Sequence, residues 1–183
     1  MRIVFLSGCA AALPSLQLLH QTGHTLTLLC PAVAEGRSAH SERTQLEAWA
    51  HTEQLPCWQV GAGELDQDLS ELIRETSPDL VLAFGFSATI NPMLLEPLRH
   101  GGWNVHFSLR PAPGNGEFEG CIFLHDWRGD HCSDLLLQRR CGIPIDHEKP
   151  MDELAREAAL LLEDALLQAA GLPHILGWPN VAL

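Results

Sequence analysis

Along the first hundred residues, the spacing of hydrophobic and polar positions changes repeatedly between that of a strand and that of a helix. A largely apolar run at 2–7 and an alternating run at 24–30 are typical of strands. Between them, the apolar spacing of residues 13–22 predicts a helix, and Gly23 follows it where a left-handed cap residue is expected. The pattern therefore predicts a strand, a helix and a second strand in this order.

The same alternation continues through the middle of the chain. In order, it predicts a loop at 31–43, a helix at 42–53, a strand at 57–60, a helix at 65–76, a strand at 79–85 and a short helix at 91–98. Beyond residue 116 the rhythm changes. Two strands are expected at 119–127 and 134–145, joined by a polar loop, and a helix rich in Ala and Leu is expected at 151–170.

Strands that alternate with helices define the expected fold class. They indicate an α/β protein with a Rossmann-like, mostly parallel sheet and helices on both faces. The 183 residues are expected to form a single domain that spans residues 1–183. In such sheets ligands bind beyond the carboxyl ends of the strands, so functional side chains are expected where predicted strands end.

Charge and composition narrow the classes of partner. The formal net charge is −12 with only 11 lysines and arginines, so nucleic acid is not expected as a partner. No apolar run reaches the roughly 18 residues of a membrane span, and the N-terminus lacks the long apolar core of a signal peptide. The six cysteines include no Cys-x-x-Cys pair and are interpreted as reduced thiols, which favours a cytoplasmic protein. The oligomeric state is left open.

Common cofactor and catalytic motifs are missing from the sequence. The first predicted strand is followed by one glycine where a dinucleotide fingerprint needs three, so a nicotinamide dehydrogenase is disfavoured. There is no Walker loop, no Gly-x-Ser-x-Gly elbow and no His-Glu-x-x-His pair. His125, His131 and Cys132 lie close in sequence, but their spacing fits no common zinc pattern, and no metal is expected.

Residues 104–111 read NVHFSLRP and carry the strongest chemical signal. Side chains alternate between the faces of a strand, so Asn104, His106 and Ser108 would share one face. A lone histidine would more simply be a core residue held by one backbone hydrogen bond. Here an amide and a hydroxyl share its face, and the segment runs into a loop rich in Pro and Gly. This combination favours an active site at a strand end.

Four stretches of the chain resemble the folate-dependent formyltransferases: MRIVFLSG, LPSLQLLHQTGH, SPDLVLAFGFSATINPMLLEPLRHGGWNVHFSLRP and QRRCGIPID. The most specific part is similar to the family motif Asn-x-His-x-Ser-Leu-Leu-Pro. The resemblance implies the formyltransferase fold, catalytic roles for Asn104 and His106, and 10-formyltetrahydrofolate as the formyl donor. Arg110 replaces an apolar residue of that motif.

The resemblance also implies a folate cleft. The loop GFSATINP is similar to the family loop that holds the pterin through backbone groups, which are available whatever the side chains are. Trp127 precedes the loop expected to close the cleft and is a further candidate for contact with the pterin. The candidate folate-binding residues are Gly85, Phe86, Ala88, Thr89, Ile90 and Trp127.

The third catalytic residue of the family is an aspartate, whose position here is ambiguous. Without gaps, the family position falls on His131, and the second acid of the pattern is Asp134. A slip of one residue, which loops tolerate, places Asp130 in the role, and Asp130 is the residue we favour. His131 at this position would instead indicate an altered triad.

A second departure concerns the acceptor side of the site. The segment APGNGEFEG is too short to hold the helix that the family usually carries between its motif and the next strand. The loss of this helix would open one wall of the acceptor site.

The reaction implied by the resemblance is formyl transfer to an amine through a tetrahedral oxyanion. Asn104 and a protonated His106 would donate hydrogen bonds to the oxyanion, His106 would then shuttle a proton, and Asp130 would raise the pKa of His106. The expected acceptor is an amine on a small molecule or on a carrier-bound substrate. Methionyl-tRNA is disfavoured because the chain is acidic and ends without the further C-terminal domain of that enzyme. Glycinamide ribonucleotide is possible, although residues 7–10 lack a phosphate cradle of several glycines, and sugar amines, amino acids and their hydroxylamines stay open as acceptors.

Two other functions remain open. A degenerate member of the fold would act as a binding or partner module without catalysis, which the shortened segment and the displaced aspartate favour. The same site would also hydrolyse formyltetrahydrofolate if water took the place of the amine.

Overall fold

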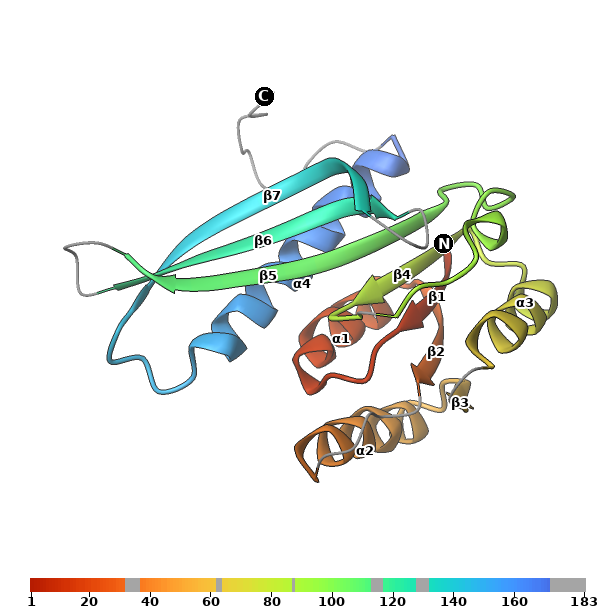
Figure 1. Ribbon diagram of the computed structural model, residues 1–183, viewed down its shortest axis with the longest axis horizontal. Helices are drawn as coiled ribbons and strands as arrows, with labels where there is room; N and C mark the ends of the chain where they lie inside the picture. The colour runs from red at the N-terminus through yellow and green to blue at the C-terminus, as the bar shows by residue number, and fades with distance from the viewer. Residues whose placement is uncertain (32–36, 62–63, 87, 113–116, 128–131, 172–183) are drawn as a thin grey trace.

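The strands of the computed structural model, which describes residues 1–31, 37–61, 64–86, 88–112, 117–127 and 132–171, form one sheet (Figure 1). These strands are β1 (Arg2–Leu6), β2 (Thr25–Pro31), β3 (Cys57–Val60), β4 (Leu80–Phe84), β5 (Gly102–Pro111), β6 (Glu117–Trp127) and β7 (Cys132–Pro144). Across the sheet their order is β3-β2-β1-β4-β5-β6-β7. The strands from β3 to β5 run parallel, and β6 and β7 are antiparallel to their neighbours.

Helices cover both faces of this sheet. They are α1 (Leu13–Gln21), α2 (Arg37–Thr52), α3 (Leu65–Thr76) and α4 (Pro150–Ala169). Ile3 and Phe5 of β1 join a buried cluster that contains side chains of α1, α2 and α4. Val4 and Leu6, which point the other way, join a second cluster that contains side chains of α3. The predicted α/β class, with a mostly parallel sheet and helices on both faces, is therefore confirmed.

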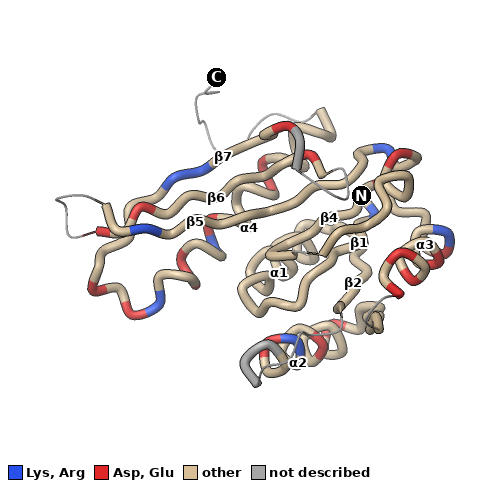
Figure 2. Tube along the Cα trace, viewed as in Figure 1, with Lys and Arg blue, Asp and Glu red and all other residues tan. Residues whose placement is uncertain are grey.

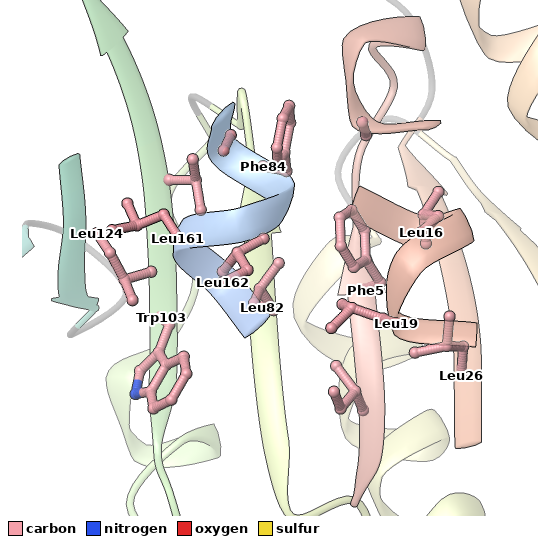
Figure 3. Close-up of a cluster of buried hydrophobic side chains, with 14 of the residues drawn as sticks. Phe5, Leu16, Leu19, Leu26, Leu82, Phe84, Trp103, Leu124, Leu161 and Leu162 are labelled. Atoms are coloured by element: carbon pink, nitrogen blue, oxygen red, sulfur yellow. The ribbon is translucent and has the colours of Figure 1, made fainter. Parts of the chain in front are cut away.

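The larger cluster lies between the sheet, α1 and α4 (Figure 3). Trp103 and Val105 of β5 belong to this cluster, and Phe107 packs against it. Each large apolar side chain buried here stabilises the fold by about 1.5–3 kcal/mol. Because side chains alternate along a strand, Asn104 and His106 lie on the opposite face of the sheet. Burial of the apolar side chains on one face of β5 thus fixes the direction of the polar side chains on its other face.

Two predicted elements differ from the structure. The helix expected at 42–53 begins earlier, at Arg37, because the polar residues of its first turns offer no apolar spacing from which a helix start could be recognised. The short helix expected at 91–98 is reduced to a 3-10 turn at Pro92–Leu94. Asn91 caps this turn, since its side-chain oxygen accepts a hydrogen bond from the backbone N–H of Met93 at 3.1 Å.

β5 and β6 are consecutive antiparallel strands that form one hairpin. Pro111 pairs with Phe118 at the end of the ladder, and the N–H of Ala112 donates to the carbonyl of Glu117 at 2.9 Å. Arg110 lies in the exposed part of this hairpin, and its Nε donates to Glu119 at 3.0 Å. The expected loss of a helix concerns a segment whose residues 113–116 lie outside the described residues.

A search of the described helices for a membrane span found none long and apolar enough.

Candidate active site

The candidate site lies where β5 passes the carboxyl ends of its parallel neighbours. The last residue of β4, Phe84, pairs with Val105, and the N–H of Gly85 donates to the carbonyl of Val105 at 3.3 Å. Asn104 therefore lies just before this edge and His106 just beyond it. Ligands of parallel α/β sheets bind at such an edge, so the two residues lie where the sequence analysis expected functional side chains.

Asn104 is buried with one polar atom unsatisfied. Its side chain is 3% exposed, and its Oδ1 has no hydrogen-bond partner within the described part of the chain. A buried amide oxygen without a partner costs about 1–3 kcal/mol of folding free energy. Such a group is expected where a ligand supplies the missing partner. The free Oδ1 of Asn104 would therefore accept a hydrogen bond from a bound ligand.

His106 is half-buried and faces a second histidine. Its ring lies 5.7 Å from the ring of His125, measured between centroids, at an interplanar angle of 71°. Burial and, to a lesser extent, the charge on His125 lower the pKa of His106 below its ordinary value. The family resemblance predicts the opposite, a pKa of His106 raised by a neighbouring carboxylate. The residue nominated for that effect, Asp130, lies outside the described residues, and the described surroundings favour the neutral imidazole instead.

His125 is the site residue whose role the sequence did not reveal. It pairs directly with Asn104 across the β5–β6 ladder, and its Nδ1 is buried without a hydrogen-bond partner among the described residues. On its other side, the register of the β6–β7 ladder shifts between Leu124 and His125, which makes the local pairing with β7 irregular. Its closeness in sequence to His131 suggested only a metal site. What brings His125 into the site is the register of β6 against β5, and a local sequence pattern does not contain this register.

The loop proposed to hold folate divides into exposed and buried residues. Gly85, Ala88 and Thr89 are exposed. Gly85 also has a positive φ of 58°, which turns the chain sharply at the end of β4. The backbone of these residues lies next to the edge at which Asn104 and His106 are found.

The other candidate folate residues are packed inside the molecule. Phe86, Ile90 and Trp127 belong to the second buried cluster, with exposed fractions of 7%, 4% and 3%. The rings of Phe86 and Trp127 lie edge to face, with centroids 5.9 Å apart. Their side chains therefore support the loop, and little of their surface is available to a ligand.

Four further sequence candidates remain. Asp130 and His131 lie outside the described residues, and Asp134 is exposed on β7. Ser108 is half-buried and pairs with Cys121 of β6.

The stretch of sheet that carries the site is uncharged. Residues 100–109 and 120–125 contain no Asp, Glu, Lys or Arg, and Figure 2 shows the middle of β5 and β6 without charged residues. With no fixed charge on these stretches, the hydrogen-bonding groups of Asn104, His106 and His125 supply their polarity.

A shallow hollow of about 370 Å³ lies at the other end of β6 and β7, between Glu117, Glu119 and Arg140. Arg140 and Glu119 form an exposed ion pair there, at 3.9 Å. None of the buried polar atoms that lack a partner among the described residues belongs to its lining. The chemistry therefore points to the edge at Asn104 and not to this hollow.

Comparison with solved structures assigns the fold. The chain superposes on glycinamide ribonucleotide transformylase 1 from Symbiobacterium toebii with a TM-score of 0.66 at 17% identity, covering 97% of this chain and 91% of that one. It superposes on a formyltetrahydrofolate deformylase from Pseudomonas syringae pv. tomato with a TM-score of 0.66 at 14% identity, covering 95% and 63%. The fold is that of the formyltransferases.

Comparison of sequences points in the same direction. The chain is 32% identical over 114 residues to methionyl-tRNA formyltransferase from Salinispora tropica, an alignment that covers 61% of this chain and 37% of that relative. The chain thus spans well under two thirds of the relative's length. No family model matches it. With the fold, this similarity confirms the resemblance inferred from the sequence: the chain has the formyltransferase fold and is similar in sequence to methionyl-tRNA formyltransferases.

Proposed function

We propose that this chain transfers a formyl group from 10-formyltetrahydrofolate to an amine of a small-molecule or carrier-bound substrate. The observation that carries the proposal is the position of Asn104 and His106 on one face of β5, where it passes the carboxyl end of β4. The buried Oδ1 of Asn104, which has no hydrogen-bond partner among the described residues, further supports the binding of a polar ligand on this face.

In this reaction the amine nitrogen attacks the formyl carbon, and the carbonyl oxygen gains negative charge in a tetrahedral intermediate. The bond from the formyl carbon to N10 of the folate then breaks, and N10 takes up a proton. Asn104 stabilises the oxyanion through its Nδ2–H. His106 donates through the single N–H of its neutral ring, because its pKa is lowered by burial and by the charge on His125.

The folate would lie along the loop that follows β4. Gly85, Ala88 and Thr89 would hold the pterin through exposed backbone N–H and C=O groups. Phe86, Ile90 and Trp127 would form the packed support beneath this loop. The bound cofactor supplies the activated formyl group. Asp130 would complete the site from the segment between β6 and β7.

The acceptor would enter over the hairpin of β5 and β6. Since Arg110 and Pro111 are exposed where the β5–β6 ladder ends, this side of the site is proposed to be open to solvent. The acceptor is thus proposed to be an amine that is not enclosed on this side. The cysteines whose side chains are described are free thiols, which supports a reducing compartment such as the cytoplasm.

A second candidate function is hydrolysis of formyltetrahydrofolate, with water as the acceptor. The observation that favours it is the exposure of Arg110 and Pro111 at the end of the ladder, because water reaches an exposed site easily. Formate released in the absence of any amine would identify this reaction.

One assay separates these functions. Purified protein is mixed with 10-formyltetrahydrofolate, with and without a panel of amines that contains amino acids, sugar amines and hydroxylamines, and tetrahydrofolate and formate are measured. We expect tetrahydrofolate to form only with certain amines. A protein that neither binds folate nor releases tetrahydrofolate would overturn the proposal. Folate binding without turnover, unchanged in His106→Ala, would indicate a non-catalytic binding module.

A further inference from the structure

We propose that His125 is the general base of this site and removes the proton from the attacking amine. This inference rests on the proposed formyl transfer. It adds a catalytic residue that lies on β6, outside the motif on β5, and it gives a function to the buried Nδ1 of His125.

The first support is the placement of His125 relative to Asn104. The two residues are direct partners in the antiparallel ladder, so their Cβ atoms lie roughly 4.5–5.5 Å apart on the same face. His106, two residues along β5, completes a triangle with them, since its ring lies 5.7 Å from that of His125. Three polar side chains therefore meet at the edge where β4 ends.

The second support is that two of these neighbouring side chains each bury an atom without a hydrogen-bond partner. The Oδ1 of Asn104 and the Nδ1 of His125 are both buried, and neither makes a hydrogen bond within the described part of the chain. A neutral amine that attacks a carbonyl carries N–H groups and needs acceptors for them. An amide oxygen and an unprotonated imidazole nitrogen are such acceptors. The pair therefore matches the attacking group better than it matches the oxyanion, which needs donors.

The proposed step balances as follows. The lone pair of the amine forms the new bond to the formyl carbon while one of its protons passes to Nδ1 of His125. The intermediate collapses, the bond between the formyl carbon and N10 breaks, and the proton held by His125 is delivered to N10. The products are a formamide and tetrahydrofolate, and His125 returns to its neutral form.

The surroundings of His125 suit this role. From β5 it faces Asn104 and His106, and from β6 it neighbours the ring of Phe123 at 6.2 Å between centroids. Its partner on β7 is the apolar Leu135, next to the exposed Asp134. When His125 takes up a proton, its charge disfavours a second charge on His106. His106 therefore stays a neutral hydrogen-bond donor while His125 acts as the base.

The test compares kcat and its pH profile in wild type, His125→Gln, His125→Asn and a control, His100→Gln. His100 is also partly buried, with a lowered pKa and an unpartnered Nε2 within the described residues, but it lies before β5 at the opposite edge of the sheet. We expect kcat of both His125 variants to fall by about 100-fold or more, with folate affinity unchanged. The pH profile of both variants should differ from that of wild type, and added imidazole should restore part of the rate to a third variant, His125→Ala.

The outcomes separate the two proposals. Wild-type protein without turnover with any amine contradicts the proposed function, and the role of His125 with it. Active wild type, with a His125→Gln or His125→Asn variant that is folded by circular dichroism and keeps its kcat and pH profile, contradicts the role of His125 alone. A similar loss in His100→Gln would also contradict it, because the effect would then be one of stability.

Discussion

Asn104 and His125 lie directly opposite each other on β5 and β6, and each buries a polar side-chain atom that has no partner in the described structure. Two adjacent unsatisfied groups on one ladder disfavour folding, since each loses its contact with water without gaining a protein contact. Their burial is understandable if a ligand supplies the partners. The predictions below follow from this pair and from the packing around it.

Replacement of Asn104 by Ala should separate stability from activity. The variant loses an oxyanion donor, so we expect kcat to fall by about 100-fold or more. It also removes an unsatisfied buried oxygen, so the free energy of unfolding in urea should stay equal to that of wild type or rise. Both quantities are measured on the same preparation.

The matched control is Leu124→Ala, one residue before His125 on β6. Leu124 is wholly buried on the other face of the sheet, so its truncation should cost about 2–5 kcal/mol of stability. The activity of the molecules that remain folded should be close to normal. A loss of stability in Asn104→Ala as large as in Leu124→Ala would contradict the assignment of Asn104 to a ligand site.

The pKa of His106 should rise when His125 is replaced by Gln. Burial lowers this pKa most, and the charge on His125 lowers it further. Removing the second cause should move the pKa upward, toward but not above the ordinary value, because the burial remains. Titration of the imidazole signals by NMR measures the change. The pKa of His100, which is lowered by its own burial and by Arg99, should not move.

Asp130 and Asp134 should differ in their effect on the reaction. If Asp130 completes the site as proposed, Asp130→Asn should reduce kcat by about 100-fold, on the scale of other groups that act on the transferred proton. Asp134 is exposed on β7, so Asp134→Asn should leave kcat within about two-fold of wild type. The reverse order of effects would move the family aspartate to Asp134. Loss of activity in His131→Gln alone would indicate the altered triad.

Gly120 should not tolerate a side chain. A Cβ added there would lie 2.5 Å from Cδ2 of Leu154 on α4 and 2.9 Å from Sγ of Cys141 on β7. Gly120→Ala should therefore push α4 away from β6 and reduce the unfolding free energy by about 1–3 kcal/mol. Gly8→Ala is the control, because its nearest contact would be an ordinary 3.8 Å. Equal stability of the two variants would contradict this close packing.

Cys57 should react with iodoacetamide faster than Cys30. Their sulfur atoms lie 4.0 Å apart, and this hydrogen-bonding contact lowers the pKa of Cys57 while it raises that of Cys30, which burial raises further. Cys57 is also partly exposed, whereas Cys30 is fully buried. Time-resolved mass spectrometry of the modified peptides measures both rates, and equal rates would contradict the asymmetry.

Much of the fold could be predicted from local patterns because each signal lies within a few residues. Gly23 follows α1 with a φ of 86°, and Asn91 caps the turn after it, as their positions in the sequence predict. The start of α2 could not be predicted, since a polar first turn carries no apolar period. Where local patterns fail, tertiary packing determines the element.

The candidate site divides in the same way. The alternation within NVHFSLRP alone determines that Asn104 and His106 share a face, because side-chain direction along a strand is a local property. Only the tertiary structure decides that His125 lies opposite Asn104, that Trp127 packs against Phe86, and that the pKa of His106 is lowered. These facts depend on the register of β5 against β6 and on burial by distant residues. Register and burial arise when the whole sheet assembles, and no short stretch of sequence contains them.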